Sequence, residues 1–205
     1  MRLDKKTEVI VSPLTPVVLT LFVALSSPVL LGALLAAALI HEWGHWVVLR
    51  HFGGHISRVT ITPFGAEMTV ADTTRLSYGA EILVTLAGPA VNLLLALCLG
   101  LAGGRWEGAY VFAGAQLVLG VFNLIPARPL DGARALWLLT AWLTEPFTAD
   151  RVTAAVGGVF AAALLVGGLA LMGRTGGSPF LLLGAVGLMM SAFREKGLVK
   201  FTPAR

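Results

Sequence analysis

The chain has 205 residues, of which 57% are hydrophobic and only 13% are charged, and its mean hydropathy is +0.84. This composition is typical of an integral membrane protein, and no polar interval is long enough to bury a soluble core of its own. The formal net charge of +4 is better explained by basic residues beside a lipid bilayer than by nucleic-acid binding. We therefore expect one membrane domain over residues 1–205, with no nucleic-acid partner.

The chain begins with a basic segment that resembles the start of a signal peptide. Many further apolar segments follow it and no small-residue cleavage site stands out, so we expect this start to be retained. A first membrane span is predicted at about 13–27. A second, at about 29–50, begins after Pro28, a suitable helix start, and is stopped by Gly53 and Gly54.

Between about 56 and 70 the pattern changes from helical to alternating. Val59 and Ile61 alternate before a Pro-Phe-Gly turn, and Met68 and Val70 alternate after it, which predicts a short β-hairpin. Such a ribbon must lie in the membrane interface or pack against protein, because lipid cannot pair its backbone groups. It also offers an edge to which an extended substrate could add as a strand.

A third span is predicted at about 79–102, and its Gly88-Pro89-Ala90-Val91-Asn92 segment would let another helix approach closely. The next apolar run, about 109–143, is too long for one straight span. Pro126, Pro129 and Asp131 interrupt it, so we expect a broken fourth helix that lines a protein-enclosed or wet cavity. Two Gly- and Ala-rich spans without charge follow, the fifth at about 152–172 and the sixth at about 179–193, and a basic tail occupies 194–205.

The predicted fold is thus an all-α polytopic membrane protein of about six transmembrane helices, with a β-hairpin between the second and third. Six spans put both termini on one side, and that side receives most of the lysines and arginines, whereas the opposite loops hold only Arg105 and Arg174. The positive-inside rule predicts cytoplasmic termini. The second helix then runs inward, and its last turns lie toward the cytoplasm.

Those last turns carry His41-Glu42-Trp43-Gly44-His45. Residues four apart lie on one face of a helix, so His41 and His45 can offer imidazole nitrogens to one metal ion. Glu42 is beside them and suits a general base acting on a metal-bound water, as in zinc hydrolases. Ionisable side chains at membrane depth are costly, which favours a functional role for all three.

A catalytic zinc usually takes three protein ligands, so a further ionisable side chain is expected at similar depth. Asp131 is the best candidate, because prolines and Gly132 open the backbone around it. The alternative is that Asp131 only caps the restarted helix. Arg128 and Arg134 flank it; we prefer that they reach toward the headgroups, and the alternative is that they tune its charge.

The His41–His45 motif, together with Asn123-Leu124-Ile125-Pro126 and Leu130-Asp131-Gly132, resembles the paired signature of the site-2 proteases, the intramembrane zinc metalloproteases. The similarity covers about 13–143 and points to a minimal form, close to the branch that processes sporulation sigma-factor precursors. It implies one Zn²⁺ held by His41, His45 and Asp131. It also implies catalysis by Glu42, with the amide of Asn123 stabilising an oxyanion.

By the same resemblance, the substrates are membrane-embedded or membrane-associated proteins, and the location is a prokaryotic cell membrane. We expect Phe64, in the hairpin turn, and Asn92, in the third span, to contact substrate. Two alternatives from other classes are a divalent-metal transporter and a catalytically silent membrane scaffold. A transporter would need further ligands along a path, and a scaffold would not need Glu42. The sequence indicates no oligomeric state.

Overall fold

The structure is a computed structural model that describes residues 8–13, 15–16, 20, 23, 27–62, 65–70, 76–102 and 107–175. The predicted first span is described only at positions 13, 15, 16, 20, 23 and 27, and the predicted sixth span lies wholly outside the described residues. The chain divides into two compact units, residues 1–121 and residues 122–203. Each unit is considered by itself below.

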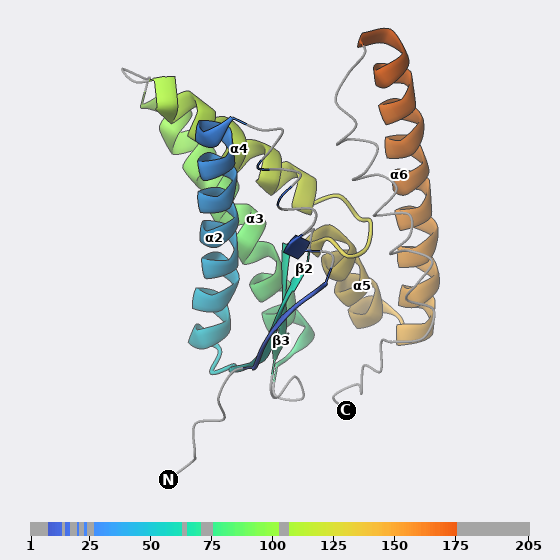
Figure 1. Cartoon of the computed structure of the whole chain (residues 1–205). Helices are drawn as coiled ribbons and strands as arrows, with labels where there is room; N and C mark the ends of the chain where they lie inside the picture. Colours follow the sequence, from blue (N-terminus) through green and yellow to red (C-terminus); the bar gives the residue numbers. More distant parts are fainter. Residues whose placement is uncertain are drawn as a thin grey trace. The chain divides into compact units, whose positions relative to one another are not determined.

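Two long helices lie side by side in the first unit, α2 (Pro28–His51) and α3 (Tyr78–Leu101) (Figure 1). Both begin at a serine whose hydroxyl accepts a backbone N–H: Ser27 from Leu30 at 3.2 Å and Ser77 from Ala80 at 3.3 Å. These caps satisfy donors that the first turn of a helix leaves unpaired. Both helices match the spans predicted at about 29–50 and 79–102.

The end of α2 also follows from its sequence. Gly53 has φ +74, a left-handed conformation that L side chains rarely adopt, and Gly54 donates its N–H to the carbonyl of Leu49 at 2.9 Å. This closure stops the helix and turns the chain toward the strands. A small apolar cluster of Leu49, Leu76, Ala80 and Val84 then packs the end of α2 against the start of α3.

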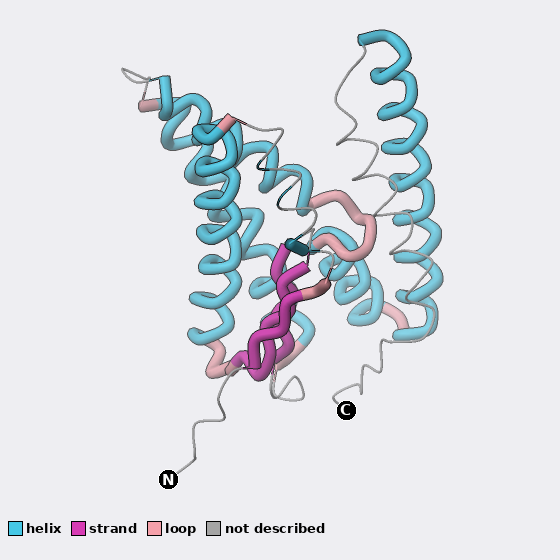
Figure 2. Tube along the Cα trace, in the orientation of Figure 1, coloured by secondary structure: helices cyan, strands magenta, loops and turns pink. Residues whose placement is uncertain are grey.

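The first unit also contains a three-stranded sheet of β1 (Glu8–Val11), β2 (Ile56–Thr62) and β3 (Gly65–Val70), shown in magenta in Figure 2. The predicted hairpin is confirmed, since β2 and β3 pair antiparallel with Val59 opposite Met68. The extra strand was not predicted: β1 pairs parallel to β2, and Arg58 donates to the Glu8 carboxylate at 2.8 Å. Consequently β2 is the central strand and is paired on both sides, so the edge expected from this hairpin can lie only on β3.

The break in the fourth apolar run is confirmed. Helix α4 (Glu107–Asn123) ends where an irregular segment, 124–130, begins, and α5 (Asp131–Leu143) follows it. In the second unit α5 lies beside α6 (Pro146–Thr175) (Figure 1). Helix α6 includes the predicted fifth span and starts about one and a half turns before it.

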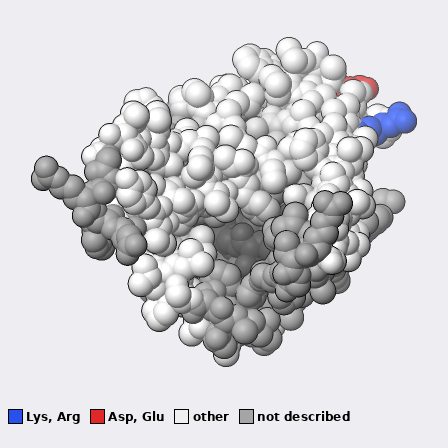
Figure 3. Space-filling view, turned by 90° about the horizontal axis from the view of Figure 1, so that it is seen from above, with Lys and Arg blue, Asp and Glu red and all other residues white. Residues whose placement is uncertain are grey.

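Three helices are long and apolar enough to cross a membrane within the described residues, namely 28–51, 78–101 and 146–170. Helix α4 is apolar but shorter. The face in Figure 3 carries almost no Lys, Arg, Asp or Glu among its described residues. The length and hydropathy of the three helices suit a bilayer, and the chain is an integral membrane protein; the count of six spans stays a prediction.

Candidate metal centre

Helix α2 brings His41 and His45 together. Their Nε2 atoms are 3.1 Å apart, and the ring planes are nearly perpendicular at 84°. His41 is 5% exposed and His45 is half-buried, so both rings face protein rather than lipid. This arrangement is the one predicted from their four-residue spacing.

The other nitrogen of each ring is tied to an oxygen on α3. His45 Nδ1 lies 2.8 Å from the carbonyl oxygen of Val84, which can only accept, so Nδ1 carries the proton. His41 Nδ1 lies 2.7 Å from Asn92 Oδ1. Reversing the Asn92 amide would break a hydrogen bond, because its Nδ2 donates to the carbonyl of Ala37 at 3.1 Å. His41 Nδ1 therefore donates as well.

With hydrogen on Nδ1 of both neutral imidazoles, the two Nε2 lone pairs point into the same space. Neither Nε2 can donate a hydrogen bond to the other. A divalent cation satisfies both lone pairs at once. Zinc bound tetrahedrally, with Zn–N bonds of about 2.0–2.1 Å, holds two nitrogens about 3.3 Å apart, close to the observed 3.1 Å. The histidine pair therefore fits zinc.

Two glycines make room for the rings. A Cβ on Gly88 would stand 2.6 Å from His45 Cε1, and a Cβ on Gly44 would stand 2.8 Å from Val91 Cγ1 and 2.9 Å from the carbonyl oxygen of Ala87. Contacts this close do not occur between real side chains. Glycine at both positions lets α2 and α3 approach closely enough for α3 to hold both histidines, as the small residues of the third span predicted.

Glu42 follows His41 directly on α2 and is half-buried. Adjacent helical residues are about 100° apart around the axis, so its carboxylate leaves the helix beside the two imidazoles rather than in line with them. A side chain placed this way suits a base next to a metal better than a third ligand on the same face.

Asp131 and Asn123 belong to the second unit, at the two ends of the irregular segment. Asn123 is the last residue of α4, and Asp131 is the first of α5; both are half-buried. The residue at the N-cap position of α5 is Leu130, whose side chain makes no capping hydrogen bond, so Asp131 is the first helical residue and not the N-cap. Gly132 is required here, since a Cβ would meet the carbonyl oxygen of Ile125 at 2.7 Å.

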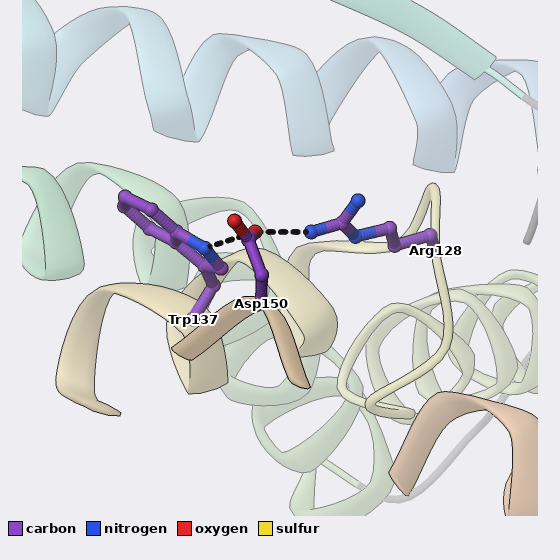
Figure 4. A network of polar contacts seen from close by, with 3 residues as sticks. All are labelled: Arg128, Trp137 and Asp150. Carbon is purple, nitrogen blue, oxygen red and sulfur yellow. Dashed lines mark hydrogen bonds and ion pairs between the residues drawn. The ribbon is translucent and has the colours of Figure 1, made fainter. Parts of the chain in front are cut away.

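A polar network fastens the irregular segment to both helices of the second unit (Figure 4). Asp150 on α6 accepts from Trp137 Nε1 at 2.8 Å and from Arg128 Nη2 at 3.3 Å through the same carboxylate oxygen. Arg128 therefore pairs with Asp150, a partner that the sequence did not indicate. By holding residue 128, the network limits the movement of the chain just before Asp131.

Phe64 and Asn92 were expected to contact substrate, and the structure describes only Asn92. Phe64 lies outside the described residues. Asn92 is 0% exposed, and its described hydrogen bonds go to His41, Ala37 and Gln116. Gln116 on α4 was missed, although an amide in the middle of an apolar helix was a visible signal.

A histidine pair with this geometry, buried between apolar helices, defines a metal-binding membrane protein. Residues 29–108 match the sequence profile described as Peptidase family M50. That range contains the histidine pair and Asn92 and ends before Asn123.

Relatives that match the chain include zinc metalloprotease Rip3 of Mycobacterium tuberculosis, 37% identical over 62% of this chain and 35% of its own length. A zinc metalloprotease of Methanocaldococcus jannaschii is 28% identical over 69% of this chain and 43% of its own. Stage IV sporulation protein FB of Bacillus subtilis is 32% identical over 52% of this chain and 38% of its own. The chain thus spans well under half the length of these curated relatives.

Among solved structures, the site-2 protease from Methanocaldococcus jannaschii shares the fold with a TM-score of 0.68 and 24% identity, over 99% of this chain and 98% of that one. Residues 29–108 therefore match Peptidase family M50, and the chain shares the fold of that site-2 protease. The names of the Mycobacterium tuberculosis and Methanocaldococcus jannaschii relatives give their metal as zinc, and the histidine pair of this chain fits zinc.

Proposed function

We propose that this chain is an intramembrane zinc metalloprotease that hydrolyses peptide bonds in membrane-embedded or membrane-associated proteins. The observation that carries the proposal is the histidine pair, whose Nδ1 atoms are held by α3 so that both Nε2 atoms face one point. Glu42, the residue after the first histidine, adds the base that hydrolysis needs.

The proposed ligands are His41, His45 and Asp131. A third protein ligand is expected because catalytic zinc sites usually have three and leave one position open. Asp131 suits this role because it begins a helix directly after a fixed irregular segment and is not the cap of that helix. When bound, zinc supplies Lewis-acid chemistry at the carbonyl and lowers the pKa of water.

Glu42 is the proposed general base. Its carboxylate removes a proton from the attacking water and later delivers that proton to the leaving amine. The amide of Asn123 is proposed to donate to the oxyanion that forms on the scissile carbonyl. Burial of the site among apolar helices limits access by bulk water and strengthens these interactions.

The proposed substrate is a protein in or on a prokaryotic cell membrane, with the chain's termini and its active-site side toward the cytoplasm. A substrate helix must unwind locally, because its peptide carbonyls are engaged in helical hydrogen bonds. We propose that the unwound segment adds to β3, whose outer side pairs with no strand in the described part of the chain, and that Phe64 contacts the substrate nearby.

The test is a cleavage assay on single-span substrates with purified protein, combined with metal analysis. Glu42→Gln should keep the fold and one bound zinc while cleavage falls about 10²–10⁴-fold, the usual contribution of a general base. Glu145→Gln, a change of an exposed carboxylate between α5 and α6, is the matched control and should cleave normally. Full activity in Glu42→Gln would remove this residue from the mechanism.

The ligand set is tested in the same preparations. Asp131→Ala should lower zinc occupancy as His41→Ala does, because each removes one protein ligand. Unchanged zinc and activity in Asp131→Ala would mean that another residue is the third ligand. Metal flux into vesicles without cleavage would favour a transporter, and absence of both would favour a silent scaffold.

A further inference from the structure

Two buried amides form a chain behind His41. Asn92 on α3 and Gln116 on α4 are both 0% exposed. Asn92 Oδ1 faces His41 Nδ1 at 2.7 Å, while its Nδ2 donates both to the carbonyl of Ala37 and to Gln116 Oε1. Gln116 Nε2 is buried and has no hydrogen-bond partner within the described part of the chain.

The packing of α4 on α3 is built for this contact. Gly120 lies one turn after Gln116, and a Cβ there would meet Leu93 Cγ at 3.0 Å and Asn92 Cβ at 3.2 Å. Glycine therefore lets α4 approach α3 at the level of Asn92. Burying two amides between apolar helices, one with an unpaired donor, costs stability that an apolar pair would not cost.

The direction of the Asn92 amide decides which nitrogen of His41 carries the proton. Both Nδ2 hydrogens have acceptors, so Oδ1 must face the imidazole and accept from Nδ1–H. A reversed amide would present its NH₂ to Nδ1 and favour the tautomer with hydrogen on Nε2. That tautomer cannot offer Nε2 to a metal until it loses the proton.

We propose that Asn92 and Gln116 are positioning residues that hold His41 as the Nδ1–H tautomer, with Gln116 fixing the direction of the Asn92 amide. The expected effect of these residues on metal affinity rests on the proposed function, because it assumes that His41 binds zinc. The effect on the tautomer is a property of the protein without metal. The experiments can therefore contradict the proposed zinc site and the proposed role of Asn92 and Gln116 independently of each other.

The first measurement is zinc affinity by competition with a chromophoric chelator. Asn92→Leu should weaken binding about 10–100-fold, as loss of a ligand's orienting partner typically does. Gln116→Leu should weaken it less, because Ala37 still restrains the Asn92 amide. Thr85→Val is the matched control: it removes a buried hydroxyl with no described partner from the same face of α3, and affinity should not change.

The conservative variant provides a rescue. In Asn92→Asp one carboxylate oxygen accepts from His41 Nδ1–H, and the unpaired Gln116 amide can turn to donate to the second oxygen. The hydrogen bond to the Ala37 carbonyl is lost, because both oxygens accept. This variant should bind zinc within a few-fold of the wild type. Adding Gln116→Leu to it should lose most of that affinity, a coupling that a purely structural role of either residue would not produce.

The second measurement is ¹⁵N NMR of histidine side chains in the metal-free protein, with His41 assigned by difference from His41→Gln. The wild type should show hydrogen on Nδ1 of His41, and Asn92→Leu should show a mixture of tautomers. If Asn92→Leu does not fold, Gln116→Met, which keeps the side-chain length, should still shift the tautomer population. An unchanged tautomer together with unchanged zinc affinity in the folded variants would overturn the proposal.

Discussion

At the scale of residues, α3 holds both histidines of α2 by different means. Its backbone carbonyl at Val84 binds His45, and one turn later Gly88 leaves the space that the His45 ring occupies. Another turn on, Asn92 binds His41. The stripe of α3 that faces α2 is therefore shaped for two imidazoles, and any side chain at Gly88 would compete with one of them.

Gly88→Ala should displace the His45 ring and weaken zinc binding about 10–100-fold, because the orientation of a ligand is lost. Gly100→Ala is the matched control on the same helix, since a Cβ at Gly100 meets nothing within 4 Å. There, alanine should leave zinc affinity unchanged and stabilise the helix by about 0.5–1 kcal/mol. Chelator competition and thermal unfolding report the two effects, and equal zinc affinity in both variants would contradict the packing of Gly88 on His45.

The elements that the sequence predicted are those with local signals. Prolines and glycines mark the starts and ends of α2 and of the broken fourth run, and alternation marks β2 and β3. Strand β1 has only four exposed residues and pairs with a segment about fifty positions away, so no local pattern distinguishes it. In the same way, helical spacing predicted the histidine pair, whereas the Gln116–Asn92 contact depends on how α3 and α4 pack.

Because β2 is the central strand, a variant of β2 cannot test whether an extended substrate adds to the sheet as a further strand. Both of its sides are paired, so proline at Val59 or Ile61 would break the sheet itself. Within the hairpin, the open edge belongs to β3. Neighbouring residues of a strand direct their N–H groups to opposite sides, so one of Glu67 and Met68 points its donor at β2 and the other at the open edge.

We expect one of the variants Glu67→Pro and Met68→Pro to lower the melting temperature and the other to keep it. The latter should cleave a helical single-span substrate several-fold more slowly while binding zinc normally, because a backbone donor to the added strand is lost. Glu67→Ala and Met68→Ala control for the side chains. Normal cleavage by a stable proline variant would show that the substrate does not add to β3.

At the scale of the whole molecule, the distribution of basic residues predicts which end of each membrane helix lies on the cytoplasmic side. Arg50 lies in the last turn of α2 and Arg58 follows that helix, whereas Arg105 is the only basic residue between α3 and α4. Basic residues near helix ends are retained on the cytoplasmic side. If α3 crosses the bilayer, its two ends are therefore on opposite sides, with its start cytoplasmic.

Single cysteines in a Cys98→Ala background test this orientation at exposed positions. His55→Cys, after α2, and Glu145→Cys, between α5 and α6, should react with a membrane-impermeant thiol reagent only from the cytoplasmic side. Ala102→Cys, at the end of α3, should react only from the outside. The Cys98→Ala parent, which removes the chain's only thiol, should not react from either side.

Comparing two of these positions tests whether the segment between them crosses the bilayer. Labelling of His55→Cys and Ala102→Cys from the same side would mean that α3 does not span the bilayer, despite its length and hydropathy. Labelling of Ala102→Cys and Glu145→Cys from the same side would mean that α4 and α5 together enter and leave on one face. The break at 124–130 makes that re-entrant path physically available, because an irregular segment can turn back wherever protein pairs its backbone groups. We expect a full crossing instead, because Arg151 follows the start of α6 and should remain on the cytoplasmic side.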